Sequence, residues 1–261
     1  MRMAIDESSP IGVFDSGVGG LTVVKSLYEQ LPHEQILYFG DTAYVPYGGR
    51  QPKELIGFAL SIADYLIQSG CKLIIIACNT STALAYNLIR ETSPIPVIGM
   101  IEPGVRSALE ASGKGTIGII ATQVTVQSNA YQRLLAQQAP ERDVFALACP
   151  DLVPLVESGI TKDAAAKAKV QKCLQPIKER DIESLILGCT HYPYLLPELT
   201  KYAPADLFID PSAYFAQFIK NDISPASGTG SERFYVSASP ENFIKAAKMF
   251  FISIPDKIEL Q

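Results

Sequence analysis

Two cysteines of this 261-residue chain, Cys78 and Cys189, lie where short apolar runs end and small polar residues begin. The residues that follow them are Asn79, Thr80, Thr190 and His191. A thiol near the N-terminus of a helix is stabilised as a thiolate, which lowers its pKa from the usual value of about 8.5. Such a thiol acts as a base as well as a nucleophile. The pattern predicts two thiols that face one cleft and transfer protons as a pair.

An acidic residue and a glycine-rich stretch follow the first apolar run. Asp15 precedes the segment 16–20, Ser-Gly-Val-Gly-Gly, which fits neither the dinucleotide-binding pattern nor the P-loop pattern. Its glycines favour close approach of the backbone to a small anion. Asp15 is either a solvated helix cap or a group that orients or deprotonates a thiol.

Two further polar features have both a structural and a functional interpretation. The segment Tyr47-Gly48-Gly49-Arg50 is typical of an ordinary turn, but as a functional loop it would offer amide donors. A lone histidine such as His191 is usually a surface residue or a satisfied core residue. Its place two residues after Cys189 predicts a role in proton transfer.

The remaining cysteines, Cys71, Cys149 and Cys173, are interpreted as structural. Five scattered cysteines in a chain of this length are expected to be free thiols in a reducing compartment.

Other chemistries fit these residues less well. No metal site is expected, because the cysteines lack C-x-x-C spacing and the chain has only 2 histidines. A protease-like pair of Cys78 and His191 would leave Cys189 without a role. Pyridoxal phosphate is not formally excluded, but no lysine stands at these strand ends to form its Schiff base.

Short apolar runs alternate with helical patterns, which is typical of parallel sheets covered by helices. The run 73–77 is uniformly apolar, as expected for a central strand buried on both faces. Strand patterns of the first half recur in order in the second half, and 185–189 matches 74–78 with a cysteine at the same place. We therefore predict two α/β lobes. Residues 1–98 plus 211–261 form the first lobe, and residues 99–210 form the second.

Composition and charge exclude several classes of function. The chain has 22 Lys+Arg against 27 Asp+Glu, a net charge of -5, and no basic run that would bind nucleic acid. Its longest apolar run, 73–78, is far shorter than the roughly 20 residues of a membrane-spanning helix. Residues 1–10 lack the apolar core of a secretory signal. We expect a cytoplasmic protein without nucleic-acid or membrane partners.

Taken together, the motifs resemble those of glutamate racemases in the aspartate/glutamate racemase family. The resemblance spans residues 11–215 and rests on Asp15-Ser16-Gly17-Val18-Gly19-Gly20, Gly40-Asp41-Thr42, Pro46-Tyr47-Gly48, Ala77-Cys78-Asn79-Thr80, Ile101-Glu102-Pro103, Ala121-Thr122, Cys149-Pro150 and Leu187-Gly188-Cys189-Thr190-His191-Tyr192-Pro193. The segment 15–20 separates glutamate racemases from aspartate and hydantoin racemases better than the cysteines do, because the wider family shares the thiol pair.

The resemblance implies two pseudo-symmetric flavodoxin-like lobes with the active site in the cleft between them. It implies a homodimer that interconverts L- and D-glutamate without a cofactor and supplies D-glutamate for peptidoglycan synthesis. By this resemblance Cys78, assisted by Asp15, deprotonates the D enantiomer, and Cys189, assisted by His191, deprotonates the L enantiomer. The positions that match substrate-binding residues are Asp15, Ser16, Tyr47, Gly48, Asn79, Thr80, Thr122, Thr190 and His191.

Rival functions differ in the number of thiols that they need. A non-catalytic binding protein for an amino acid or dicarboxylate needs the anion-binding residues but no thiol pair. An aspartate or other amino-acid racemase keeps both thiols, whereas a cysteine-dependent decarboxylase uses one. Inversion without a cofactor requires a base on one face of the α-carbon and an acid on the other, which favours a racemase.

Overall fold

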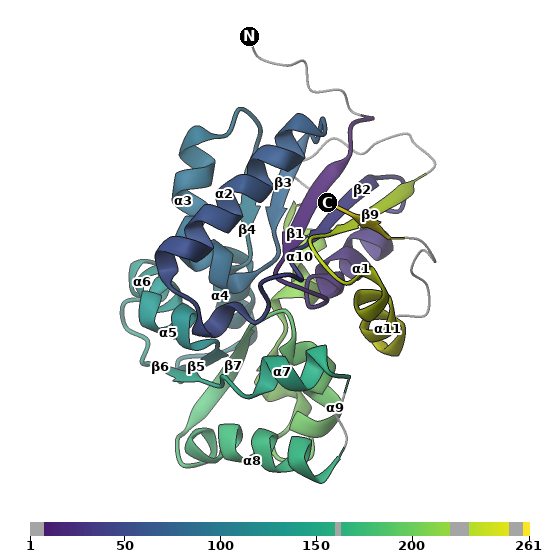
Figure 1. The fold of residues 1–261 in the computed structure, drawn as a ribbon. Coiled ribbons are helices and arrows are strands. Elements are labelled where there is room, and N and C mark those ends of the chain that lie inside the picture. Colours follow the sequence, from purple (N-terminus) through teal and green to yellow (C-terminus); the bar gives the residue numbers. More distant parts are fainter. Residues whose placement is uncertain (1–7, 160–162, 220–229, 251–257) are drawn as a thin grey trace.

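Two parallel β-sheets form the centres of two lobes in the computed structural model, which describes residues 8–159, 163–219, 230–250 and 258–261 (Figure 1). The strand order is β10-β9-β2-β1-β3-β4 in the first sheet and β6-β5-β7-β8 in the second. Helices cover both sheets. The predicted two-lobed α/β fold with parallel sheets is confirmed.

The bounds of the elements follow the alternation expected from the sequence. The strands are β1 (Ile11–Asp15), β2 (Gln35–Gly40), β3 (Leu73–Ile76), β4 (Val97–Gly99), β5 (Thr116–Ala121), β6 (Val144–Ala148), β7 (Ile182–Gly188), β8 (Phe208–Ile209), β9 (Ser231–Val236) and β10 (Glu259–Leu260). The α-helices are α1 (Leu21–Gln30), α2 (Pro52–Gln68), α3 (Asn79–Thr92), α4 (Ile101–Ala111), α5 (Gln123–Ser128), α6 (Ala130–Gln138), α7 (Leu152–Glu157), α8 (Ala164–Lys178), α9 (Leu196–Leu199), α10 (Pro211–Ile219) and α11 (Pro240–Phe250). Short 3₁₀ helices are η1 (Tyr47–Gly49), η2 (Tyr192–Leu195) and η3 (Ala205–Leu207).

Strand β3 shows why its sequence is uniformly apolar. Successive side chains of a strand point to opposite faces of the sheet. Leu73 and Ile75 pack into one hydrophobic cluster, whereas Ile74 and Ile76 pack into another. Both faces of this central strand are therefore covered, and Cys78 lies just beyond its carboxyl end.

The two lobes are connected by the chain, which passes from one to the other and back, and by side chains that pack between them. Between β4 and α4 the chain leaves the first sheet, and it returns with β9, which pairs in parallel with β2. Helix α10 packs against both α1 and α4. One hydrophobic cluster includes Val18 and Leu21 near the first sheet together with Leu187 and Tyr192 near the second. This shared core fixes the position of one sheet relative to the other. The exact lobe boundaries stay a prediction.

The expectation that all cysteines are free thiols is wrong for two of them. Cys149, at the end of β6, and Cys173, on α8, form a disulfide with a Cα–Cα distance of 5.8 Å. Both belong to the same hydrophobic cluster, so packing between elements separated along the chain brings them together. Cys71, Cys78 and Cys189 are free. The inference of a reducing compartment relied on five free thiols, and the disulfide takes that support away.

Within the described part of the chain, no helix combines the length and the apolar character that crossing a membrane requires.

Candidate active site

The predicted functional residues lie at the carboxyl ends of strands in both sheets, and these ends face each other. The hydroxyl of Thr190, after β7, donates a hydrogen bond of 3.0 Å to Oδ2 of Asp15, at the end of β1. On the other side of the site, the hydroxyls of Thr80, after β3, and Thr122, after β5, are 2.9 Å apart. In open α/β sheets ligands bind beyond the carboxyl ends of strands. The candidate site therefore lies between the lobes.

Cys78 is a buried thiol that precedes the first turn of α3. Burial raises its pKa to about 12, and the negative charges of Asp15 and Cys189 add to the rise. A hydrogen bond from the Ser81 backbone opposes this shift but is outweighed. The expected lowering of this thiol's pKa is therefore wrong, because desolvation exceeds the effect of the helix N-terminus. Cys78 is therefore a protonated acid at neutral pH.

Cys189 owes its electrostatic environment to a histidine. The 3₁₀ helix η2 follows it, so the helix-dipole argument made for this cysteine is weak. Its Sγ lies 3.8 Å from Nδ1 of His191, and Nε2 of that ring lies 2.6 Å from Oε1 of Glu157. His191 is only 1% exposed. Its environment is therefore set by the two side chains that its ring nitrogens contact.

The charge of His191 follows from these two contacts. Burial lowers the pKa of the imidazole, but the hydrogen bonds to Cys189 and Glu157 outweigh burial and raise its pKa well above the usual value. The ring is therefore an imidazolium at neutral pH. The charged ring lies 3.8 Å from the Cys189 sulfur, close enough to exchange a proton with it.

Asp15 is buried between the lobes. Besides Thr190, the N–H of Gly17 donates to this carboxylate over 3.0 Å. Burial raises the pKa of Asp15, and the charge of His191 and the two hydrogen bonds lower it less. The carboxylate thus lies close enough to both Cys78 and His191 to influence each of them.

The pKa of Asp15 leads to a prediction about stability. A carboxyl whose pKa is raised by folding stabilises the folded state below its unfolded pKa of about 3.9, and this contribution is lost as pH rises through the folded pKa. Asp15→Asn is therefore expected to raise the melting temperature at pH 7 by about 2 °C or more. The gain should disappear near pH 3, where Asp15 is protonated in both states. Thermal unfolding at both pH values measures this, with exposed Asp64→Asn as the control. A lower melting temperature at pH 7 would mean that the ionised carboxylate stabilises the fold.

The glycines of segment 16–20 let this loop lie against the second lobe. A Cβ atom on Gly17 would overlap with Oε1 of Glu157, and one on Gly19 would overlap with Nδ1 of His191 and Oγ1 of Thr190. The N–H of Val18 donates a 3.2 Å hydrogen bond to the same Glu157 oxygen. Close approach of the backbone to the second lobe thus explains Gly17 and Gly19.

Gly19→Ala is expected to displace His191, because the added methyl group takes the place of the ring nitrogen. Overpacking of this kind destabilises a fold by about 1–3 kcal/mol. The melting temperature should fall, and the pKa of His191, followed by NMR, should move toward its ordinary value as the ring leaves Cys189. Gly57→Ala on α2 is the control, because nothing lies within 4 Å of a Cβ there. An unchanged His191 titration would show that the loop yields instead of the histidine.

A cluster of hydroxyl and amide groups occupies the opposite side of the site. The hydroxyl of Thr125 lies 2.9 Å from that of Thr122 and 3.1 Å from that of Thr80. The Tyr131 hydroxyl donates a 2.7 Å hydrogen bond to Oδ1 of Asn79. These groups can donate to or accept from a carboxylate or an ammonium group. Asn79, Thr80 and Thr122, predicted from sequence, are thus brought together across the lobes.

The segment that carries Tyr47 and Gly48 also reaches this region. Tyr47 shares a small hydrophobic cluster with Cys78, and a Cβ atom on Gly48 would contact Thr122. The Tyr47 hydroxyl donates to Asp41, which also accepts a 2.7 Å hydrogen bond from Ser237. Ser16 is buried next to Asp15. The structure therefore brings all the predicted site residues to the facing strand ends.

Sequence reasoning missed three residues of the site. Thr125 could have been found, because a threonine three residues after the helix-capping Thr122 is placed to contact it. Tyr131 and Glu157 carry no comparable signal, since each lies on a helix away from any strand-end motif. Glu157 is the more consequential omission because it is the carboxylate partner of His191.

Comparison with known proteins identifies the family of this chain. The family model for Asp/Glu/hydantoin racemases matches residues 11–219. A glutamate racemase of Picosynechococcus sp. is 42% identical over 253 residues, which cover 94% of this chain and 90% of that protein. The crystal structure of a Bacillus anthracis glutamate racemase isoform has a TM-score of 0.91 at 34% identity, covering 98% of this chain and 97% of that one. A Francisella tularensis glutamate racemase, solved in complex with D-glutamate, has a TM-score of 0.87 at 35% identity and the same coverage.

Proposed function

Because this chain belongs to the Asp/Glu/hydantoin racemase family, we propose that Cys78 and Cys189 are the two thiols with which it inverts the α-carbon of glutamate. The chain is an amino-acid racemase that interconverts L- and D-glutamate. One observation carries the assignment of the thiols: two free cysteines follow central strands of different lobes, close enough for the charge of Cys189 to raise the pKa of Cys78.

Inversion of the α-carbon sets the geometric requirement. A single base would return the proton to the face from which it came, so one group must remove the proton and another must deliver one from the opposite face. Thiols carried by facing lobes meet this requirement when the substrate lies between them. The proposal assigns one face of the α-carbon to Cys78 and the other to Cys189.

The surroundings of the two sulfurs support different roles in proton transfer. Cys189, beside the imidazolium of His191, would accept the α-proton of L-glutamate. Cys78, with its pKa raised to about 12, holds a proton that it would donate to the other face. The reverse reaction starts from the opposite protonation states, and the ammonium group of the substrate would help to offset the charge of a Cys78 thiolate.

Most of the reduction of the barrier must come from groups that stabilise charge on the substrate carboxylate as the carbanion forms. The hydroxyls of Thr80, Thr122 and Thr190 and the amide of Asn79 are assigned to this role and to holding the ammonium group. Segment 16–20 and Gly48 would add backbone donors. Because these groups belong to buried strand ends, their orientation is set before the reaction begins.

The wider setting is part of the same proposal. We propose that the enzyme works without a cofactor, as a homodimer in the cytoplasm. Its product would supply D-glutamate for peptidoglycan synthesis. Both thiols, in this proposal, come from one chain, so the chemistry within a protomer does not need the partner's residues.

The test of this function is exchange of the α-proton of each glutamate enantiomer in heavy water. The purified protein is dialysed against a chelator and assayed without added cofactor, by NMR for exchange and by chiral separation for inversion. Exchange accompanied by inversion is expected for both enantiomers. Binding without exchange would contradict the racemase assignment, and dependence on an added cofactor would contradict the two-thiol chemistry. Aspartate, assayed in parallel, should turn over much more slowly than glutamate.

A further inference from the structure

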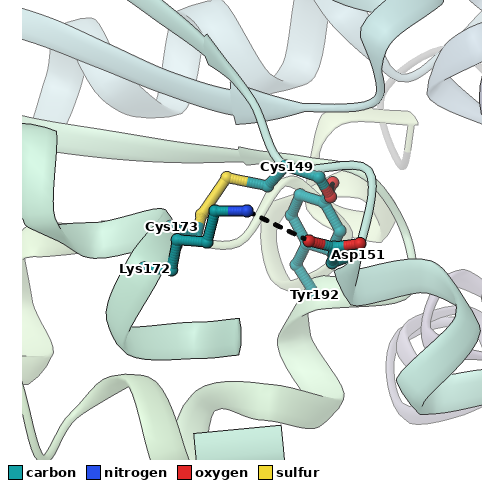
Figure 2. Close-up of a disulfide and its surroundings, with 5 residues drawn as sticks. All are labelled: Cys149, Asp151, Lys172, Cys173 and Tyr192. Carbon is teal, nitrogen blue, oxygen red and sulfur yellow. Dashed lines mark hydrogen bonds and ion pairs between the residues drawn. A yellow bond between two sulfur atoms is a disulfide. The ribbon is translucent and has the colours of Figure 1, made fainter. Parts of the chain in front are cut away.

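The disulfide between Cys149 and Cys173 lies outside the candidate active site but is connected to it through Tyr192. The carbonyl of Cys149 accepts a 2.9 Å hydrogen bond from the Tyr192 hydroxyl, and Figure 2 shows the tyrosine beside the turn that carries Cys149. Tyr192 is fully buried and directly follows His191. Any displacement of the Cys149 backbone therefore changes the support of the segment that carries His191.

Helix α7 provides a second connection. It begins at Leu152, just after Cys149, and ends at Glu157, whose carboxylate contacts His191. The disulfide links the segment before this helix to α8. An ion pair of 3.9 Å between Asp151 and Lys172 joins the same two segments (Figure 2). The start of α7 is thus fastened to α8, and its end positions the imidazolium.

The disulfide can be reached from the surface. A cavity of about 260 Å³ is lined by both cysteines and by Lys169 and Lys172. Cys173 is 8% exposed and Cys149 is 3% exposed, so Cys173 is the more exposed residue of the pair. Asp151, the acidic residue of the lining, is paired with Lys172. The lining therefore carries a net positive charge, which attracts anions and favours thiolates.

We propose that Cys149 and Cys173 form a thiol–disulfide exchange site for an anionic low-molecular-weight thiol, and that the disulfide holds α7 so that Glu157 keeps His191 in place. Exchange-labile disulfides in reducing compartments are usually transient and redox-sensing. The second half of this inference rests on the proposed function of Cys189 and His191.

The exchange proceeds in two balanced steps. A thiolate of the small molecule attacks Sγ of Cys173, a mixed disulfide forms, and Cys149 leaves as a thiolate that takes a proton from solvent. A second thiolate then attacks the sulfur of the bound small molecule, which releases Cys173 and a small-molecule disulfide. Two electrons pass from two thiols to the protein disulfide. Oxidation by the small-molecule disulfide is the reverse of these steps.

The first experiment measures the exchange without reference to activity. The full-length protein is incubated with defined ratios of reduced glutathione to glutathione disulfide, quenched with acid, alkylated and analysed by peptide mass. We expect a reversible conversion of the cross-linked peptides of Cys149 and Cys173 into alkylated peptides. Lys172→Gln should slow reduction by glutathione about threefold or more, and should slow reduction by 2-mercaptoethanol less, because its attacking thiolate carries less negative charge than that of glutathione. Cysteines that stay thiols at every ratio, or rates independent of Lys172, would overturn the site.

The second experiment compares the activities of the oxidised and reduced proteins. Reduction is expected to lower kcat for L-glutamate about fivefold with little change in KM, because a small displacement of His191 affects proton transfer more than binding. Cys173→Ser should show the reduced activity at every glutathione ratio. Cys149→Ala serves as a second variant if the first folds poorly. Cys71→Ser, whose sulfur is free and lies in the first lobe, should respond to glutathione like the wild type.

The outcomes separate this inference from the proposed function. Equal activity of the oxidised and reduced wild-type proteins would overturn the coupling between the disulfide and His191. A protein without racemase activity in either state would contradict the proposed function instead, while peptide mass would still decide whether exchange occurs. If the activity of Cys173→Ser itself changed fivefold with the glutathione ratio, the change would trace to other thiols and would overturn the coupling.

Discussion

Cys78→Ser and Cys189→Ser are each expected to reduce racemisation of glutamate about a thousandfold. A serine hydroxyl is a far weaker acid than a thiol, and general acid–base catalysis by a positioned group typically contributes about 10²–10⁴-fold. Because the reaction needs one group on each face, the loss should be nearly the same whichever thiol is removed. Chiral separation of the products measures the racemisation rate directly.

The residual chemistry of these variants distinguishes the two faces. Cys78→Ser should keep exchange of the α-proton of L-glutamate, because Cys189 can still remove and return a proton on its own side. Cys189→Ser should keep exchange only with D-glutamate. Cys71→Ser, a buried free cysteine outside the site, is the control for loss of a thiol. Residual exchange with the same enantiomer in both active-site variants would contradict the assignment of one thiol to each face.

Glu157→Gln is expected to reduce kcat for L-glutamate about tenfold to a hundredfold at pH 8. The 2.6 Å contact between its carboxylate and His191 is one of the interactions that keep the buried ring positively charged. A hydrogen bond to a charged group contributes about 1.5–3 kcal/mol, which corresponds to this range of rates. Without the carboxylate, burial lowers the pKa of His191, and Cys189 loses the positive charge beside it.

The pH dependence of the Glu157→Gln variant shows in which direction the pKa of His191 moves. In the wild type the raised pKa keeps His191 protonated above neutral pH. In Glu157→Gln the ring loses its proton at a lower pH, so the alkaline limb of the profile for L-glutamate should move to lower pH. Glu179→Gln, an exposed residue that caps α8 in the same lobe, is the control for the loss of one negative charge. A uniform loss of activity with an unmoved alkaline limb would mean that Glu157 supports the fold and does not set the charge of His191.

The candidate site could be predicted from the sequence wherever its residues belong to strand-end motifs. Asp15, Cys78, Thr122 and Cys189 each lie within two residues of the end of a buried apolar strand. Local patterning determines such a strand and its direction, and parallel strands necessarily bring their carboxyl ends to one edge. Alternation of strands and helices then determined the class of fold. These inferences need only the order of residues along a few short segments.

The charges of the site depended on the packing of the two lobes. The pKa of Cys78 follows from the depth of its burial and from Asp15, and the charge of His191 follows from Glu157 on a separate helix. A helix N-terminus is visible in a sequence, whereas desolvation is a property of everything that packs around a group. The sequence therefore placed Cys78 and Cys189 at strand ends, where the structure has them, but it assigned the wrong direction to the pKa of Cys78.

The disulfide, like the charges of the site, depends on tertiary packing and not on local sequence patterns. The sequence by itself determined the strands, the lobes and the residues at their ends, because hydrophobic periodicity and turn residues act over short distances along the chain. Only the tertiary structure decided that Cys173 meets Cys149, that Glu157 meets His191 and that Thr190 meets Asp15. Each of these pairs joins separate elements, and their approach depends on how the helices and the two sheets pack, which no local pattern records.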